Sequence, residues 1–259
     1  MSDPSQHRQI LGVNFYVGDV RGAVGRLSRG GLLVVPAAPA LKDISSNEEY
    51  RDALTNADVA IADSALMVLL WNLIERDSIR RISGLRYLRV LLQQEDVRSP
   101  GNTLWVMAGS KSREKNLEWL RSKQINIPLE CVYDAPMYKS KIEDRQLIDL
   151  AHAVRPKHVI ITVGGGTQER LGLYLKRNLD YLPAIHCIGA AIAFLSGDQV
   201  RIPDWADRIY LGWLFRCISS PRRFVPRYLS APLLVPLLWH YRNELPALRT
   251  GEQPLTQAE

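Results

Sequence analysis

Short apolar runs alternate with amphipathic segments of helical periodicity from residue 31 to about residue 195, and this alternation restricts the fold more than any other feature. Continuous apolar runs are typical of strands that are buried on both faces. Their alternation with helices predicts a parallel, doubly wound sheet covered on both sides, which is an α/β fold. The predicted strands cover 31–36, 58–63, 103–109, 128–134, 157–166 and 184–189, and the predicted helices cover 47–57, 64–74, 83–94, 112–123, 142–154 and 167–179.

The pattern changes after Gly197, where the strand alternation ends. Residues 201–245 are rich in Arg, Trp, Tyr and Pro, and we interpret them as helices separated by proline breaks near residues 221, 226 and 232. Residues 246–259 are polar, and we expect them to be disordered. The sequence therefore predicts a core over 1–200, a helical appendage over 201–245 that associates with membranes, and a disordered tail over 246–259.

The positive charge of the chain is concentrated in this appendage. Of a net charge of +6, the window from Arg201 to Arg242 holds +5, because it contains seven arginines, two aspartates and no lysine. A solvated helix face and a nucleic-acid patch are two interpretations, but no nucleic-acid fold motif supports the second. Arginines interleaved with Trp and Tyr favour a third, helices on an anionic membrane surface that also meet a lipid diphosphate. The residues assigned to this role are Arg201, Trp205, Trp213, Arg216, Arg222, Arg223 and Arg227.

No segment predicts a membrane-spanning helix, which needs about 20 apolar residues. The stretch 229–239 has eleven residues and two prolines, and the longer stretch 59–74 contains Asp63 and Ser64. The first ten residues lack the apolar stretch of a signal peptide, so we expect none. The three cysteines have no CxxC spacing and indicate buried thiols of a reducing compartment. We therefore expect a cytoplasmic protein that lies on the inner face of the cell membrane.

The stretch VGGGTQERLG, residues 163–172, forms a glycine corner between a predicted strand and a predicted helix. Gly164 and Gly166 fit the first two positions of the dinucleotide fingerprint, but Glu169 occupies the third, so the close helix–strand packing expected there is lost. One interpretation is a tight corner without a ligand. The other is a phosphate at the helix N-terminus, with Gln168 bonding a base or a sugar hydroxyl, which favours a nucleotide sugar over a dinucleotide.

Ligands of doubly wound sheets bind at the carboxyl ends of the strands. Asp63 follows such a strand and is either the N-cap of the next helix or a general base. Tyr138 either stacks on a base or belongs to an ordinary interface. The five histidines show no pairing or metal-ligand spacing, so we predict no metal site. The residues assigned to donor binding are Ser64, Gly109, Tyr138, Gly164, Gly165, Gly166, Thr167, Gln168, Glu169 and Gly189.

Six motifs together resemble one family, the WecG/TagA/CpsF family of bacterial glycosyltransferases. The last motif is the most specific, because it holds Arg-x-Pro-x-Trp, Pro-Arg-Arg and Arg-Tyr in the family's order, and because Gly212, Trp213 and Arg216 follow the order of the family's Gly-x-x-Trp-x-x-Arg helix. The resemblance covers about residues 31–229. The motifs are ADVAIAD (57–63), RISG (81–84), LWVMAGS (104–110), VGGGTQE (163–169), IGAAIAFLSG (188–197) and RIPDWADRIYLGWLFRCISSPRRFVPRYL (201–229).

The resemblance implies a Rossmann-like core with a helical C-terminal appendage. It also implies an inverting, metal-independent transferase that moves a hexose or N-acetylhexosamine from a UDP-sugar to a polyprenyl-diphosphate-linked acceptor in cell-surface polysaccharide synthesis. The UDP-sugar is the substrate, and no cofactor is expected. Asp63 matches the family's proposed general base, Arg81 its R-x-x-G arginine, and Gln168 its corner glutamine. A surface role for Arg81 beside Arg80 is the alternative to a contact with the diphosphate leaving group.

The sequence departs from the family pattern at several positions. Ser64 replaces the usual glycine, Gly166 replaces a proline, and Ala193 replaces an aspartate. Pro36 and Ala38 stand where the family has Thr-x-Asn. Two polar donor-site side chains are therefore missing, which favours a divergent member with a different donor. A catalytically degenerate nucleotide-sugar-binding scaffold is the second interpretation, and a nucleotide-dependent enzyme such as a methyltransferase is a weaker third. A homo-oligomer is left open.

Overall fold

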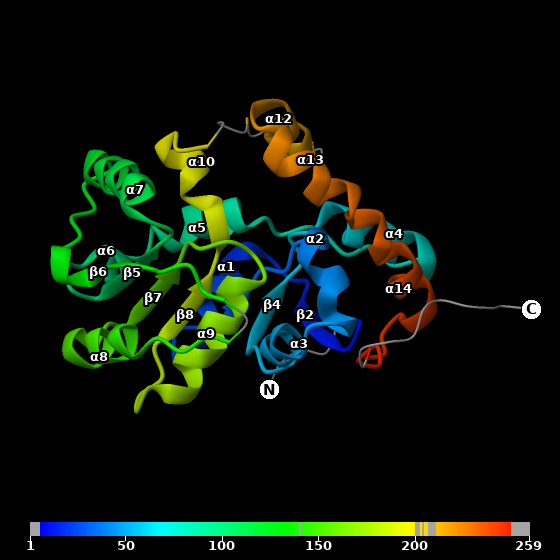
Figure 1. Ribbon diagram of the computed structural model, residues 1–259, viewed down its shortest axis with the longest axis horizontal. Helices are drawn as coiled ribbons and strands as arrows, with labels where there is room; N and C mark the ends of the chain where they lie inside the picture. Colours follow the sequence, from blue (N-terminus) through cyan, green and yellow to red (C-terminus); the bar gives the residue numbers. More distant parts are fainter. Residues whose placement is uncertain (1–5, 140, 200–202, 204, 207–210, 250–259) are drawn as a thin grey trace, which may run out of the picture.

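The computed structural model describes residues 6–139, 141–199, 203, 205–206 and 211–249, and it contains one eight-stranded sheet (Figure 1). The strand order is β1-β2-β4-β3-β8-β7-β5-β6. β1 is antiparallel to β2, and the remaining neighbours pair in parallel. This arrangement confirms the predicted α/β class. The strands are β1 (His7–Ile10), β2 (Val13–Tyr16), β3 (Gly31–Val34), β4 (Val59–Ile61), β5 (Thr103–Met107), β6 (Val132–Asp134), β7 (His158–Ile161) and β8 (Ala184–Cys187).

The sheet begins with two strands that the sequence did not predict. The β1–β2 hairpin turns at Leu11 and Gly12, both with positive φ, and the turn lacks the Asn-Gly or Asp-Gly pair that signals such hairpins. The predicted strand 128–134 is also partly wrong. Its first half forms a short 3-10 helix, η3 (Leu129–Cys131), because the residue after Pro128 begins a turn, and only three residues pair with β5.

Helices cover both faces of the sheet because alternate side chains of the strands point to opposite sides. On β5, Leu104 and Val106 join one buried cluster, whereas Trp105 and Met107 join the other. The second cluster is covered by α1 (Val20–Gly25), α5 (Gly84–Leu91), α6 (Glu95–Arg98) and α7 (Ser110–Ser122). The first is covered by α2 (Ala38–Leu41), α3 (Glu48–Thr55), α4 (Ala65–Glu75), α8 (Arg145–Val154) and α9 (Thr167–Asn178).

Close packing of α9 on the sheet depends on Gly172. A Cβ built on this residue would lie 2.6 Å from both Cys187 Sγ and Leu32 Cδ1, so the helix approaches β3 and β8 more closely than a larger residue allows. The sequence assigned the loss of such packing to Glu169, and this inference was wrong. The glycine that serves this purpose stands three residues later, one turn further into the helix.

The carboxyl ends of β5 and β7 open a crevice. These strands are neighbours, but the chain leaves β5 into α7 on one face and leaves β7 into α9 on the other. The connections therefore separate at this point, which is where doubly wound sheets bind ligands. A glycine corner follows each strand, Gly109 after β5 and Gly164–Gly166 after β7, so the backbone lines the crevice without side chains.

The helices after residue 211 pack against the rest of the fold in two ways. α12 (Gly212–Ser219) and α13 (Pro221–Leu229) lie side by side at the carboxyl edge of the sheet, whereas α14 (Leu234–Tyr241) lies against α4 (Figure 1). Three leucines of α14 belong to the main core: Leu234, Leu237 and Leu238. The division at residue 200 stays a prediction, but the hydrophobic core extends beyond it.

Two prolines of this region behave differently from one another. Pro221 is the first residue of α13, a position where its missing N–H costs nothing. Pro226 lies inside α13, so the predicted break at this residue is wrong. The residue one turn earlier, Arg222, is exposed, and water can therefore solvate the carbonyl that the proline leaves unpaired.

Among the helices that the structure describes, none is both long and apolar enough to cross a bilayer. Cys131 and Cys187 are buried, as the sequence predicted. Cys217 is only half-buried, because it lies on α12 at the surface of the fold, so the prediction of three buried thiols was wrong at this position.

Candidate active site

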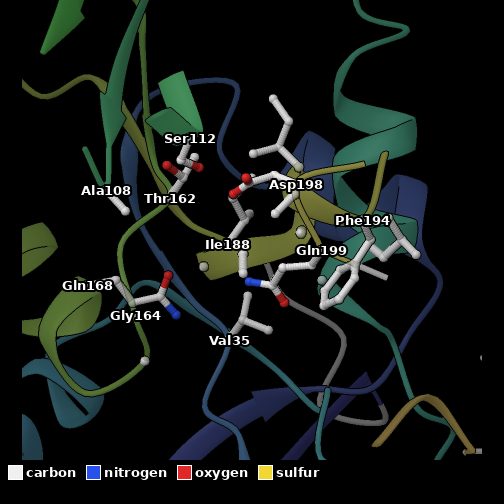
Figure 2. Close-up of a pocket in the computed structure, with 18 of the residues that line it drawn as sticks. Val35, Ala108, Ser112, Thr162, Gly164, Gln168, Ile188, Phe194, Asp198 and Gln199 are labelled. Carbon is white, nitrogen blue, oxygen red and sulfur yellow. The ribbon is translucent and has the colours of Figure 1, made fainter. Parts of the chain in front are cut away.

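A central cleft of about 530 Å³ lies over the carboxyl ends of β3, β4, β5, β7 and β8. Its walls come from the loops that follow these strands and from α10 (Ala193–Ser196). Figure 2 shows Val35, Ala108, Gly164 and Ile188 from four of these loops around one cavity. The cleft lies at the crevice that the strand connections open, so the fold itself creates the site.

Asp63 and Arg81 lie together on the wall of this cleft. Arg81 Nη2 donates to Asp63 Oδ1 at 3.0 Å, and Arg81 Nε donates to the Asp63 carbonyl at 2.5 Å. The backbone N–H of Gly84, the first residue of α5, also donates to Oδ1 at 3.2 Å. Within the described chain no donor bonds Asp63 Oδ2. The pair is therefore fixed by three hydrogen bonds while one carboxylate oxygen stays available.

Asp63 does not cap the helix that follows it. The N-cap of α4 is Ser64, whose Oγ accepts a hydrogen bond from the Met67 N–H at 3.2 Å. Ser64 therefore satisfies the start of α4. The side chain of Asp63 points instead to α5 and Arg81, which are packed on its other side.

The glycine corner is closed by a capping contact. Glu169 is fully buried and accepts the Gly166 N–H at 2.7 Å. Gln168 Nε2 donates to Glu169 Oε1 at 2.9 Å, whereas Gln168 Oε1 is buried and has no hydrogen-bond partner among the described residues. A Cβ at Gly189 would lie 3.4 Å from this oxygen. Figure 2 shows the Gln168 amide turned toward the cavity, so the corner presents an unsatisfied acceptor to the cleft.

The structure separates the predicted donor residues into two groups. Gly109, Gly164, Gly165, Gln168 and Gly189 line the central cleft. The side chains or backbone of Gly166, Thr167 and Glu169 do not line it, although they form the same corner.

Tyr138 also lies outside the cleft lining. Its hydroxyl donates to Asp144 Oδ2 at 2.6 Å, beside the Tyr133 hydroxyl, which donates to the same carboxylate. Burial raises the pKa of Tyr138, and the Asp144 charge raises it further. This tyrosine therefore supports the start of α8, whose N-cap is Asp144.

A second cavity of about 340 Å³, the side groove, opens from the same place. Its walls are mostly apolar, with Leu66 and Leu69 from α4 facing Trp213 and Pro232 from the region after residue 211. Ser64 lines this groove rather than the central cleft. The two cavities share four residues, which are Ala37, Asp63, Arg81 and Arg216.

Arg216 is the contribution of α12 to this junction. Its guanidinium stacks 4.5 Å from the centre of the Phe194 ring, and its Nη1 donates to the Tyr228 hydroxyl at 3.3 Å. The Nε–H is buried, and no described residue accepts a hydrogen bond from it. The arginine therefore brings positive charge and an unsatisfied donor to the point where the cavities meet.

The other predicted membrane residues are described in part. Trp205 and Trp213 have exposed fractions of 57% and 46%, and Arg222 is exposed on α13. Arg201 lies outside the described residues, as do the side chains of Arg223 and Arg227.

Sequence reasoning missed three features of the site. Gly84 holds Asp63 through its backbone, and no side-chain pattern reveals such a bond. Asp198 and Gln199 line the cleft, although they follow the last predicted strand (Figure 2). The expectation that no histidines pair was wrong, because His158 and His186 meet across β7 and β8, 28 residues apart. In the described parts of the chain, no cluster of three or more His, Cys, Asp or Glu side chains is placed to hold a metal ion.

Comparison with known proteins agrees with this geometry. The model of the glycosyl transferase WecG/TagA/CpsF family matches residues 8–247. A relative from Bacillus spizizenii, named N-acetylglucosaminyldiphosphoundecaprenol N-acetyl-beta-D-mannosaminyltransferase, is 23% identical over 211 residues, which cover 78% of this chain and 79% of the relative. Since the family match spans nearly the whole fold and both cavities, the chain belongs to the WecG/TagA/CpsF family and is a glycosyltransferase.

Proposed function

We propose that this protein transfers a sugar from a UDP-sugar in the central cleft to a polyprenyl-diphosphate-linked acceptor in the side groove, as a step of cell-surface polysaccharide synthesis. The observation that carries the proposal is that the two cavities meet at Asp63, Arg81 and Arg216. A transferase needs two substrate sites that share one reacting point, and this junction supplies it. The name of the Bacillus spizizenii relative gives its acceptor as an undecaprenol-linked N-acetylglucosaminyl diphosphate, which fits a groove of this kind.

The central cleft suits the nucleotide diphosphate. The N-cap of α7 is Gly109, which has no side chain to cap the helix, so the N–H groups of the first turn of α7 are left for an anion. Ser110 and Lys111 of that turn line the cleft. Across the cavity, Gln168 Oε1 is an acceptor for a base N–H or a sugar hydroxyl. Ala37 and Ala193 add apolar wall, so we expect the sugar, a hexose or N-acetylhexosamine as the family resemblance implies, to make few polar contacts there.

In this proposal Asp63 acts as the general base. Oδ2 takes the proton of the acceptor hydroxyl while that oxygen forms a bond to the anomeric carbon. The bond from this carbon to the diphosphate oxygen breaks, and its electron pair leaves with UDP. Because attack and departure occur on opposite faces, the anomeric configuration is inverted. Arg81, Arg216 and the α7 N-terminus balance the charge of the leaving UDP without a metal ion.

The side groove suits the lipid end of the acceptor. It is mostly apolar, and it opens between α4 and the exposed apolar surface of the helices after residue 211. Leu229, Leu233 and Trp239 are all more than half exposed on that surface. We propose that this surface lies on the inner face of the membrane beside anionic lipids. Flotation with anionic liposomes should recover the wild-type chain, whereas recovery equal to that with neutral liposomes would contradict this part.

The experiment that tests the function is Asp63→Asn. We expect transfer from a UDP-sugar to a short polyprenyl-diphosphate acceptor to fall by about a hundredfold to ten-thousandfold, because the base is lost. UDP binding, measured by calorimetry, should be retained, since Asn keeps the acceptor oxygen that bonds Arg81 and Gly84. Proton NMR of the wild-type product should show the inverted anomer, and excess EDTA should leave the rate unchanged.

Asp134→Asn is the matched control. Asp134 also ends a strand and pairs with an arginine, Arg113, at 2.6 Å, but it does not line either cavity. Its substitution should leave transfer unchanged. Full activity of Asp63→Asn would remove this residue as the base. UDP binding by the wild type without turnover on any donor and acceptor pair would favour a nucleotide-sugar-binding scaffold instead.

A further inference from the structure

Four side chains form a continuous hydrogen-bonded chain, the histidine chain, on the face of the sheet that α5 and α6 cover. The Tyr87 hydroxyl lies 2.9 Å from His186 Nδ1, and His186 Nε2 lies 3.1 Å from His158 Nδ1. His158 Nε2 then lies 3.0 Å from Asp96 Oδ2. Tyr87 and His186 are almost completely buried, and Asp96 is half exposed at the far end. The chain therefore runs from the protein surface into its core.

The protonation states of the two end groups, Tyr87 and Asp96, fix the direction of these hydrogen bonds. Burial raises the pKa of Tyr87, so its hydroxyl keeps its proton and donates. Burial, and then the neighbouring His158, lowers the pKa of His186 well below its usual value, so this ring is neutral and has one N–H. Burial of Asp96 opposes ionisation and is the largest single effect, but the hydrogen bond and charge of His158 and the backbone hydrogen bonds, among them the one from Val97, together lower the pKa, so the carboxylate accepts. In the arrangement that has one N–H on each ring, every donor points from Tyr87 toward Asp96.

The buried end of the chain reaches the active site through α5. Tyr87 lies in the first turn of this helix, and its backbone N–H donates to the Ser83 carbonyl at 2.9 Å. The same turn begins with Gly84, whose N–H holds Asp63 Oδ1. A Cβ on Gly84 would lie 3.4 Å from Val35 and 3.6 Å from the Ile188 carbonyl, and both residues line the central cleft. Anchoring Tyr87 therefore anchors the donor that positions Asp63.

We propose that Tyr87, His186 and His158 are positioning residues of the transferase. They fix the first turn of α5 and, through the Gly84 N–H, the Asp63 carboxylate. Asp96 sets the direction of the hydrogen bonds that connect these side chains. This inference rests on the proposed role of Asp63 as the base. It adds a function for a buried histidine pair that contacts neither substrate cavity. If every hydrogen bond were reversed, His186 would donate to the Tyr87 hydroxyl, and the Tyr87 proton would have no acceptor among these four side chains. The direction that Asp96 imposes is therefore the one in which Tyr87 donates to His186 and is held in place.

The direction of the hydrogen bonds is tested by ¹⁵N NMR of the histidine side chains at neutral pH. In the wild type we expect both rings to carry their proton on Nε2, with an unprotonated Nδ1. In Asp96→Asn the amide can donate as well as accept, so both rings should show a mixture of the two tautomers. Asp96 is half exposed, so this variant tests the chain without a buried substitution. A proton on Nδ1 of His186 in the wild type, or an unchanged spectrum in Asp96→Asn, would overturn the proposal.

The positioning role is tested by Tyr87→Phe. We expect kcat to fall by about tenfold to a hundredfold through misplacement of the base, with the KM of both substrates within about twofold. The amide resonance of Gly84 should move as well. Tyr181→Phe is the matched control, because it removes a hydroxyl that bonds the Ala151 carbonyl away from both cavities, and it should change neither quantity.

An unchanged kcat together with an unmoved Gly84 resonance in Tyr87→Phe would refute the positioning role. If the wild type transfers no sugar, the proposed function fails. The tautomer spectra and the Gly84 resonance still decide whether the chain fixes α5.

Discussion

The central cleft and the side groove share their inner end and differ in almost everything else. The cleft is built on strand ends, with glycine corners and the buried amide of Gln168. The groove is built between helices, and six of the fifteen described residues that line it lie after residue 211. The cleft presents backbone N–H groups and polar side chains, whereas the groove presents leucine, tryptophan and proline. One cavity suits a charged nucleotide that arrives from water, and the other suits a lipid-linked substrate that arrives from a membrane.

The comparison also shows how the two walls are supported. The cleft rests on β3, β4, β5, β7 and β8, which are almost completely buried, and its polar groups are held by capping and by the histidine chain. In the groove, α12 and α13 contribute few buried residues, and Arg216 is held by a ring and one hydroxyl. The described side chains of the cleft are therefore more extensively packed and hydrogen-bonded than those that α12 and α13 bring to the groove.

Among the changes that compare the two cavities, the largest effect should come from Arg216, one of the four residues that line both. Arg216→Ala should lower kcat/KM by about a hundredfold, since it removes a cation at the point where charge develops. Arg222→Ala is the control, because Arg222 is exposed on the next helix and lines neither cavity. Steady-state transfer kinetics with both substrates varied measure the effect. Equal losses of kcat/KM in the two variants would show that the overall positive charge of this region, and not the position of Arg216 at the junction, determines the rate of transfer.

A change confined to the cleft should affect only the donor. Gln168→Leu keeps the side-chain volume but removes the buried acceptor, so the Kd for UDP-sugar should rise about tenfold, or about 1.4 kcal/mol. Calorimetry measures this value, and the KM for the acceptor should stay unchanged. A larger effect on the acceptor than on the donor would reverse the assignment of the two cavities.

A change confined to the groove should affect only the acceptor. Leu69→Glu places a charge on the apolar wall, and the acceptor KM should rise severalfold to about tenfold because apolar contact with the lipid is lost. Leu73→Glu is the control on the same helix, since Leu73 is more exposed, at 76% against 54%, and does not line the groove. A rise in the Kd for UDP-sugar in Leu69→Glu would contradict the separation of the sites.

The smallest effect concerns the support beneath the cleft. Burial lowers the pKa of His186 well below its usual value, so between about pH 6.5 and the lower native pKa the unfolded chain binds a proton that the folded chain does not. The free energy of unfolding therefore falls as the pH decreases, by up to about 1.4 kcal/mol per pH unit. In His186→Asn this slope should be reduced, as measured by urea unfolding between pH 7 and pH 5. Equal slopes in the two proteins would show that His186 is not the group that titrates.

The sequence predicted the elements whose apolar pattern is strong and missed those that depend on distant contacts. Strands β3, β4, β5, β7 and β8 are buried and mostly apolar, and they carry the site. The β1–β2 hairpin was missed because its strands have four residues each and its turn contains Leu11. The end of β7 was placed too late, because Thr162 and Val163 are also typical of strands although the ladder stops at Ile161.

The sequence also predicted one part of the site and missed another. Asp63, Arg81 and Gln168 stand in motifs, and the structure brings them to one cleft. Tyr138 was assigned from its place beyond a strand, but β6 lies at the edge of the sheet, away from the crevice. The histidine chain was beyond reach, because its members come from four separate elements and no local spacing relates them.

The β1–β2 hairpin has one further consequence, for the order in which the molecule is assembled during translation. The N–H groups of Leu11 and Gly12 at its turn donate to the carbonyls of Arg242 and Asn243, and a Cβ on Gly12 would lie 2.5 Å from the Leu245 side chain. The turn of this hairpin therefore stays without these partners until the segment that follows α14 has been synthesised. Contacts between segments so distant in the sequence form slowly, so the docking of this segment on the hairpin is expected to be a late step of folding.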